Sequence, residues 1–291
     1  MNVFHRHQNA TPYLLLLPGV LFLSVFFVVP LGFLAYQSLE SGNIDFGYTF
    51  TWQWSNYWNA IHDYRDQFIR SIEYAGIATA LALVFSYPVA YWIAFRGGRW
   101  KNLLLLLIIA PFFVTYLIRT LAWETILSDH GLVVRTLGHL HLLGVLGQDG
   151  HILATGTAVV AGITYNFLPF MALPLYVSLE QVDQRLIEAA EDLYANKIRA
   201  FLRVTLPLSL PGVVAGTLLT FIPAAGDFIN AQLLGSPNNY MIGNVIQSSF
   251  LNTSNYPSAA AMSFILMGAI LAFVAVYAFV VGTEQLTGTA L

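Results

Sequence analysis

Charged side chains are scarce in this sequence of 291 residues, in which Asp, Glu, Lys and Arg together make up 9%. Soluble domains carry about a quarter charged residues, whereas this chain is 57% hydrophobic. Its charge is too low to solvate the surface of a globule of this length, so we expect the chain to lie in a bilayer. The net charge of -3 gives no support for a nucleic-acid partner.

Cysteine is absent, which excludes disulfides, thiolate metal sites and cysteine nucleophiles. The phosphate-binding pattern G-x-x-x-x-G-K-[ST] and the zinc-protease pattern H-E-x-x-H are also absent. We therefore expect no enzyme activity, and the energy for any transport must come from a partner or an ion gradient. Three histidines lie close together, but neither His139 nor His141 has a histidine or carboxylate at the helical i,i+4 spacing. With His130 they predict no metal site.

Long apolar stretches dominate the sequence. A bilayer core about 30 Å thick needs about 20 apolar residues per helix. Stretches that meet this length are residues 12–37, 70–95, 102–126, 152–179, 209–234 and 258–283. The first exceeds the roughly 7 to 15 apolar residues of a secretory signal, so it is interpreted as an uncleaved span. The predicted fold is all-α, with six transmembrane helices in a single membrane domain covering residues 1–291.

Lys and Arg are distributed unequally between the two sides of these six spans. Those on the side of the N-terminus are Arg6, Arg96, Arg99, Lys101, Arg185, Lys197, Arg199 and Arg203. The smaller set in or beside the opposite loops is Arg65, Arg70, Arg119 and Arg135. Because cytoplasmic loops carry the excess of positive charge, we predict that both termini are cytoplasmic.

The first outer loop, residues 38–69, contains the aromatic run YTFTWQWSNYWNAIHDYRDQF. One interpretation is an aromatic belt at the membrane interface. The other is a lateral helix that forms a docking surface for an outer partner. Both remain open on the sequence alone.

Charged residues concentrate in one cytoplasmic segment, residues 183–208. Within DQRLIEAAEDLY, an amphipathic helix places apolar side chains on one face and Glu188, Glu191 and Asp192 mostly on the rest. Asn196 can cap a second helix, KIRAFLRVTL, whose end is set by Pro207. An acidic helix is repelled by anionic lipid, so a protein partner with a cationic groove is favoured over a linker that lies on the membrane surface.

This segment resembles the EAA loop of bacterial ABC importer permeases, in which E-A-A is followed after three residues by glycine and later by L-P and a second proline. The matching residues are Glu188, Ala189, Ala190, Phe201, Leu206, Pro207 and Pro211. Tyr194 stands where the family has glycine, and a residue with a Cβ in the left-handed conformation costs about 1 to 2 kcal/mol. The stretches LIRTLAWETIL, AAGDF, IGNVIQSSFL and YPSAAAMS are similar to the spermidine/putrescine permeases of that superfamily.

The resemblance implies a type I ABC importer fold in a bacterial inner membrane, with coupling helices between spans four and five. It implies three partners: an ATP-binding subunit dimer that carries ATP and Mg²⁺, a second permease subunit, and an extracytoplasmic solute-binding protein. This chain would hold no cofactor, and its substrate would be a polyamine moved by alternating access. Glu188 would pair with a cation of the ATPase. The other residues expected at that contact are Ala189, Ala190, Leu193, Tyr194 and Ala195.

An ion-driven secondary transporter is the alternative. It would concentrate ionisable groups and broken helices at mid-membrane and often show inverted repeats.

Ionisable residues inside spans are functional candidates because they are costly in lipid. Asp227 has no cation within five residues and follows Pro223 and Gly226, which loosen the helix. It could bind a cationic substrate, or span five could end early and leave Asp227 as a cap. Arg119 and Glu124 could pair with each other. Glu73 could line the pathway or pair with Arg70 at i,i+3.

Polar and aromatic residues of span four complete the predicted pathway. Tyr165, Phe167 and Phe170 could offer ring faces to an ammonium group, and Asn166 precedes Pro169, which frees a backbone carbonyl near mid-membrane. Gly212 and Gly216 have the G-x-x-x-G spacing that permits close helix packing, within the chain or with a second permease subunit.

Overall fold

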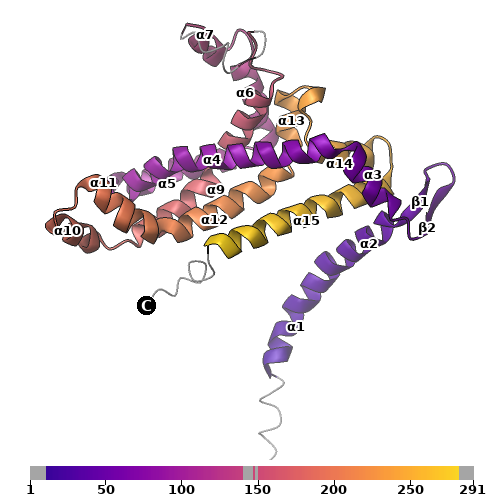
Figure 1. Cartoon of the computed structure of the whole chain (residues 1–291), viewed down its shortest axis with the longest axis horizontal. Coiled ribbons are helices and arrows are strands. Elements are labelled where there is room, and N and C mark those ends of the chain that lie inside the picture. Colours follow the sequence, from indigo (N-terminus) through magenta and orange to yellow (C-terminus); the bar gives the residue numbers. More distant parts are fainter. Residues whose placement is uncertain (1–10, 140–146, 148–149, 282–291) are drawn as a thin grey trace, which may run out of the picture. The chain divides into compact units, whose positions relative to one another are not determined.

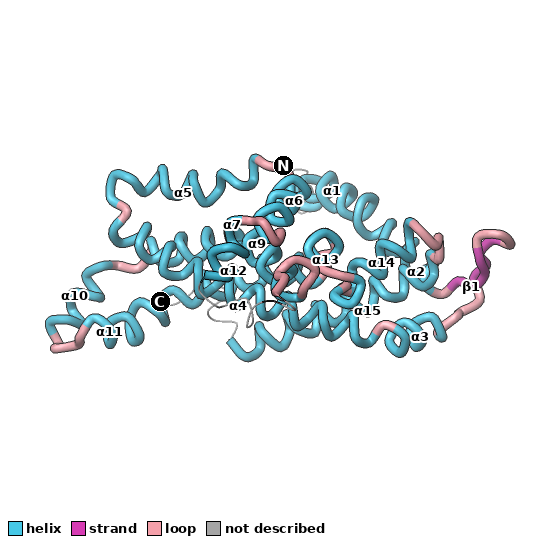
Figure 2. Tube along the Cα trace, turned by 90° about the horizontal axis from the view of Figure 1, so that it is seen from above, coloured by secondary structure: helices cyan, strands magenta, loops and turns pink. Residues whose placement is uncertain are grey.

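The structure of this chain is a computed structural model, and it describes residues 11–139, 147 and 150–281. Helices make up most of the described chain (Figure 2). The chain forms two compact units. The first contains the chain up to Asp63 together with Ile246–Ile265, and the second contains Tyr64–Val245 together with the chain from Leu266.

The first unit begins with a long apolar helix in three parts, α1 (Thr11–Leu23), the π-helical turn η1 (Ser24–Val28) and α2 (Val29–Ser38). None of the most apolar window of this helix is buried, as expected for a helix whose side chains face lipid. An antiparallel hairpin of β1 (Glu40–Asn43) and β2 (Gly47–Phe50) follows, and then α3 (Ser55–Asp63). The hairpin is a small departure from the all-α prediction.

The core of the second unit consists of three helices that pack side by side, α4 (Arg65–Arg96), α9 (Gly156–Glu180) and α12 (Leu206–Ala225) (Figure 1). The contact face of α4 is a row of alanines, Ala75, Ala78, Ala82 and Ala90. Side chains this small let helix backbones approach closely, which is the main source of helix association in lipid. In the C-terminal part of α15 (Tyr256–Val281), Phe273 stacks on Phe221 of α12 with ring centroids 3.9 Å apart.

The third predicted span, 102–126, is wrong as a single helix. This region begins with the short turn η2 (Gly98–Trp100) and α5 (Lys101–Ile109). The turn η3 (Ala110–Phe113) and α6 (Tyr116–Leu127) follow. The two parts are bent by 95°. Pro111 cannot donate a backbone hydrogen bond, and the backbone is extended at Val114 and Thr115, so the helix stops and restarts in a new direction.

Pro207 does not end the helix that follows Asn196, contrary to the prediction. The segment α11 (Lys197–Ala200) continues through the π-helical turn η4 (Phe201–Thr205) into α12. The wide π-turn lies directly before the proline, where a regular turn would bring its ring against a preceding carbonyl. The helix then ends at Ala225, well before the predicted end of span five at residue 234.

Shorter elements complete the described chain. They are α7 (Leu132–His139), α10 (Gln184–Asp192), α13 (Ile229–Leu234), η5 (Pro237–Asn239) and α14 (Ile242–Leu251). By length and apolar composition, five described helices can cross a bilayer, and a sixth is obtained if the bent pair α5 and α6 is counted as one span.

Candidate functional site

The segment 183–208 begins with the short helix α10, as the sequence predicts, whereas its second helix, α11, continues into α12. The side chain of Asp183 accepts a hydrogen bond from the Arg185 backbone N–H at 2.9 Å, which caps the start of α10. Asn196 caps α11 in the same way, with its Oδ1 2.8 Å from the backbone nitrogen of Arg199. Each cap satisfies a backbone donor that the first helical turn leaves unpaired.

Tyr194 takes the left-handed conformation that glycine adopts most readily. Its φ is 62°, and two hydrogen bonds close the end of α10 around it. The Tyr194 N–H donates to the Glu191 carbonyl at 2.9 Å, and the Ala195 N–H donates to the Ala190 carbonyl at 3.0 Å. This is the Schellman arrangement, in which the residue after the C-cap is left-handed.

The residues expected to couple to an ATPase form an open surface. Leu193 is 82% exposed and Tyr194 is 96% exposed. Glu188 and Ala189 are also exposed, while Ala190 and Ala195 are half-buried. Glu188 has no ion-pair partner in the part of the chain that the structure describes. An apolar, acidic surface without a partner is suited to docking against another protein.

A buried polar cluster lies in the second unit where α6, α9 and the α12–α13 connection meet. Asp227 is only 6% exposed. Its Oδ1 accepts from the Asn230 backbone N–H at 3.0 Å, and its Oδ2 accepts from Asn230 Nδ2 at 2.6 Å and from the Tyr116 hydroxyl. Asn166 Nδ2 donates to Asn230 Oδ1 at 3.2 Å and to Thr120 Oγ1 at 3.3 Å. Hydrogen bonds thus connect residues far apart in the sequence.

This geometry bears on both interpretations of Asp227. The helix of span five ends early, and the carboxylate accepts a backbone hydrogen bond from Asn230 in the first turn of α13, which is what the capping alternative expects. A carboxylate with these three donors is stabilised without a bound cation. A direct contact with substrate stays a prediction, and it requires Asp227 to exchange one of these partners.

Aromatic side chains surround the cluster. The Tyr116 ring lies 6.0 Å from the ring of Phe167, which lies 5.9 Å from that of Phe170. Phe170 also makes an edge contact with Phe112 at 5.0 Å. Tyr165 is turned toward Trp123, 5.3 Å away, so it does not join this group.

The expected ion pairs in the outer part of the spans do not form. Arg119 is buried and makes no ion pair with Glu124 in the described chain. Arg70 donates to the Tyr240 carbonyl at 2.8 Å and makes no ion pair with Glu73, which is exposed on α4. A pathway role for Glu73 stays a prediction. Sequence reasoning missed Tyr116, Thr120 and Asn230, because an isolated tyrosine, threonine or asparagine gives no signal.

The histidines of the third loop do not gather a metal set in the described residues. His151 was not singled out from the sequence. Its Nδ1 lies 2.7 Å from Oδ1 of Asp129. His141 lies outside the described residues.

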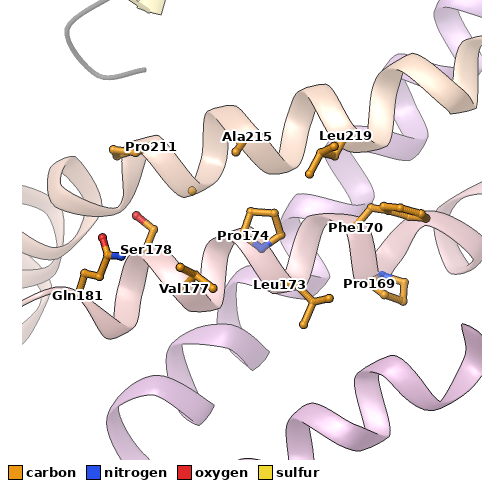
Figure 3. A pocket seen from close by; sticks show the side chains of 11 residues that line it. Pro169, Phe170, Leu173, Pro174, Val177, Ser178, Gln181, Pro211, Ala215 and Leu219 are labelled. Atoms are coloured by element: carbon orange, nitrogen blue, oxygen red, sulfur yellow. The ribbon is translucent and has the colours of Figure 1, made fainter. Parts of the chain in front are cut away.

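An apolar groove lies between α9 and α12. Its volume is about 460 Å³. Figure 3 shows Phe170 and Leu219 toward one end and Gln181 and Pro211 toward the other. Phe170 connects the groove to the aromatic group, because the same ring contacts Phe112 and Phe167.

Gly212 and Gly216 pack within the chain, on α9. A Cβ on Gly212 would lie 2.5 Å from Ser178 Cβ and 2.7 Å from the Pro174 carbonyl oxygen. A Cβ on Gly216 would lie 2.7 Å from Met171 Sδ. The G-x-x-x-G spacing therefore serves the α9–α12 contact.

Known proteins resemble this chain over most of its length. Residues 84–283 match the family described as "Binding-protein-dependent transport system inner membrane component". The spermidine/putrescine transport system permease protein PotB of Haemophilus influenzae is 37% identical over 265 residues, which are 90% of this chain and 87% of that protein. PotB of Escherichia coli is 41% identical over 211 residues, 72% of this chain and 76% of that protein.

The fold also matches solved structures. A chain of the bacterial alginate ABC transporter in complex with an alginate pentasaccharide-bound periplasmic protein superposes with a TM-score of 0.71 at 18% identity, covering 98% of this chain and 99% of that chain. At this identity the match concerns the fold alone.

Proposed function

This chain belongs to the family of binding-protein-dependent transport system inner membrane components, and we propose that its cargo is a polyamine such as spermidine or putrescine. It is a multi-pass inner-membrane permease with the fold of ABC importer permeases. The observation that carries the cargo proposal is the 37% identity over 90% of the chain with a spermidine/putrescine permease.

The chemistry of the second unit is compatible with a cationic cargo. The buried carboxylate of Asp227 and the ring faces of Tyr116, Phe167 and Phe170 are groups that attract ammonium ions. Tyr165 and Glu73 lie apart from this group. In the proposal, Asp227, Asn166 and Phe170 line the path, with Asn166 holding Asn230 and through it the carboxylate.

The energy source is proposed to be a separate ATPase. The sequence has no phosphate-binding loop, so ATP and Mg²⁺ belong to that partner and this chain needs no cofactor of its own. Docking would use α10 and the turn after it, where Glu188 pairs with a cation of the ATPase and Ala189, Ala190, Leu193, Tyr194 and Ala195 contact its groove. The exposure of this surface supports the assignment.

Two further partners complete the proposed importer. A solute-binding protein would deliver the polyamine from outside, and a second permease subunit would form the other half of the pathway. The solved alginate transporter, in complex with its periplasmic protein, supports a solute-binding partner for this fold.

Transport in liposomes tests the cargo. The complete importer, supplied with its solute-binding protein, should accumulate radiolabelled spermidine only when ATP is present on the ATPase side. Glucose, which carries no charge, should give no uptake. Failure to accumulate any polyamine would overturn the cargo proposal, and uptake by this chain alone without ATP would identify an ion-driven transporter.

Charge reversal tests the coupling surface. Glu188→Arg should abolish co-purification with the ATPase and lower substrate-stimulated ATP hydrolysis by more than tenfold, because a cation would then face a cation. Asp45→Arg makes the same charge change on an exposed residue of the hairpin turn and should leave both unchanged. Retained ATPase binding in Glu188→Arg would remove this residue from the contact.

A further inference from the structure

Arg119 is a buried cation without an anionic partner. Its side chain lies on α6 and the residue is 8% exposed. Neither Nε nor Nη1 has a hydrogen-bond partner in the described chain, and no described carboxylate forms an ion pair with it. A cation left in this state is costly inside a protein and in a membrane. Packing alone therefore does not explain why an arginine is buried at position 119.

Ring faces are what the guanidinium contacts instead. Its Cζ lies 5.8 Å from the ring centroid of Phe112 and 5.6 Å from that of Tyr116. Both distances fall within the range over which a cation is attracted to the negative face of an aromatic ring. The guanidinium thus occupies a cation site made of two rings.

The same two rings belong to a larger aromatic group. Phe112 contacts Phe170, Phe170 contacts Phe167, and Phe167 contacts Tyr116. The Tyr116 hydroxyl donates to the buried carboxylate of Asp227. Phe170 lines the groove between α9 and α12. The Phe112 and Tyr116 rings are therefore linked by contacts to the apolar groove through Phe170 and to the buried Asp227 carboxyl group through the Tyr116 hydroxyl.

We propose that the faces of Phe112 and Tyr116 form an ammonium site on the transport path, and that the Arg119 guanidinium occupies this site as a tethered competitor until an amine displaces it. The inference rests on the proposed function, since it assigns a site for the amine that the permease carries. An anion would not suit the same position, because ring faces repel negative charge.

Displacement of the guanidinium makes the site selective for alkylammonium groups over small metal cations. A small metal cation loses its hydration without gaining enough from two ring faces, whereas an alkylammonium group brings a weakly hydrated cation with an apolar stem. Arg119 leaves the site only when such a group replaces its interaction with the rings. The long side chain can then extend toward water.

Binding of radiolabelled spermidine to the complete importer in nanodiscs tests the site. Arg119→Met removes the charge and keeps an unbranched apolar side chain, so spermidine should bind about tenfold more tightly than to the wild type. Arg119→Lys keeps a tethered cation and should stay within about twofold of the wild type. Phe112→Leu removes one ring face and should weaken spermidine binding severalfold, both alone and combined with Arg119→Met.

The outcomes separate this inference from the proposed function. If the wild-type importer takes up no polyamine, the cargo proposal fails. If uptake is present but Arg119→Met binds spermidine no more tightly, or Phe112→Leu has no effect, the site assignment fails. Loss of transport in Arg119→Met with recovery in Arg119→Lys would show that the guanidinium serves an anionic partner, which also overturns the inference. The Phe112→Leu result decides the matter should Arg119→Met not fold.

Discussion

Tyr194 holds a backbone conformation that residues with a Cβ rarely adopt, and nothing in the described chain covers its side chain. The Schellman hydrogen bonds of the neighbouring residues fix the turn around it. Backbone hydrogen bonds therefore hold Tyr194 in its strained conformation. Its exposed ring gains no packing in the described chain. A strained and exposed aromatic residue is consistent with a contact made by a partner.

Tyr194→Gly should stabilise the turn by about 1 kcal/mol, because glycine adopts positive φ without a clash. Hydrogen exchange at the Tyr194 and Ala195 amides should slow correspondingly. Tyr194→Asn is the matched variant, since asparagine also tolerates this conformation and keeps a side chain. If both variants couple to the ATPase as well as the wild type, the tyrosine is merely tolerated. Weaker coupling in both, despite a firmer turn, would show that the ring is part of the contact.

Irregular turns near prolines shape the helices as much as their runs of apolar residues do. Pro111 lies where the third span bends by 95°, whereas Pro207 lies inside a helix that continues. The difference lies in the preceding backbone, because a π-helical turn comes before Pro207 and a 3₁₀ turn contains Pro111. A proline thus marks a perturbed turn, and its surroundings decide whether the helix ends.

Gly212→Ala should weaken the packing of α12 against α9. The new Cβ would meet Ser178 Cβ and the Pro174 carbonyl oxygen, both far inside normal contact distance, and overpacking of this kind costs about 1 to 3 kcal/mol. Gly76→Ala on α4 is the control, because nothing lies within 4 Å of its added Cβ. That variant should be neutral or gain about 0.5 to 1 kcal/mol from helix propensity. Thermal unfolding in detergent measures the stability of both variants. Equal melting temperatures for the two would contradict the α9–α12 contact.

Across the whole molecule, sidedness follows from the distribution of Lys and Arg. The segment around α10 and α11 carries Arg185, Lys197 and Arg199, whereas the run from the first span to Tyr64 contains neither lysine nor arginine. The positive-inside rule then predicts that α10 is cytoplasmic and that the β1–β2 hairpin lies outside. Orientation is a property of the assembled set of loops, so it is tested on intact membranes.

Single cysteines can report this orientation, because the sequence contains no native cysteine. Glu188→Cys and Asp45→Cys both replace exposed side chains. A membrane-impermeant maleimide added to intact spheroplasts should label Asp45→Cys and leave Glu188→Cys unlabelled, and inverted vesicles should give the opposite result. The reverse pattern would invert the assignment and place the coupling surface on the wrong side for an ATPase.

The sequence predicted those features of local structure that depend on a single segment of the chain. The apolar runs at 70–95 and 152–179 correspond to α4 and α9, because a helix in lipid must satisfy its backbone internally and cover it with apolar side chains. The cap at Asn196 and the left-handed turn at Tyr194 also depend only on nearby residues. These features required no knowledge of which helices meet.

Contacts between segments were decided only by the tertiary structure. Asp227 was singled out from the sequence, but its partners Tyr116 and Asn230 were not, and the expected partner of Arg119 proved to be a pair of rings instead of Glu124. Such pairings depend on how each helix is rotated and shifted against its neighbours, which no local pattern encodes. The sequence by itself determined a multi-pass membrane permease and predicted a cytoplasmic coupling segment. The tertiary structure decided which polar groups meet, because a buried group takes whichever donor or acceptor the packed helices bring within reach.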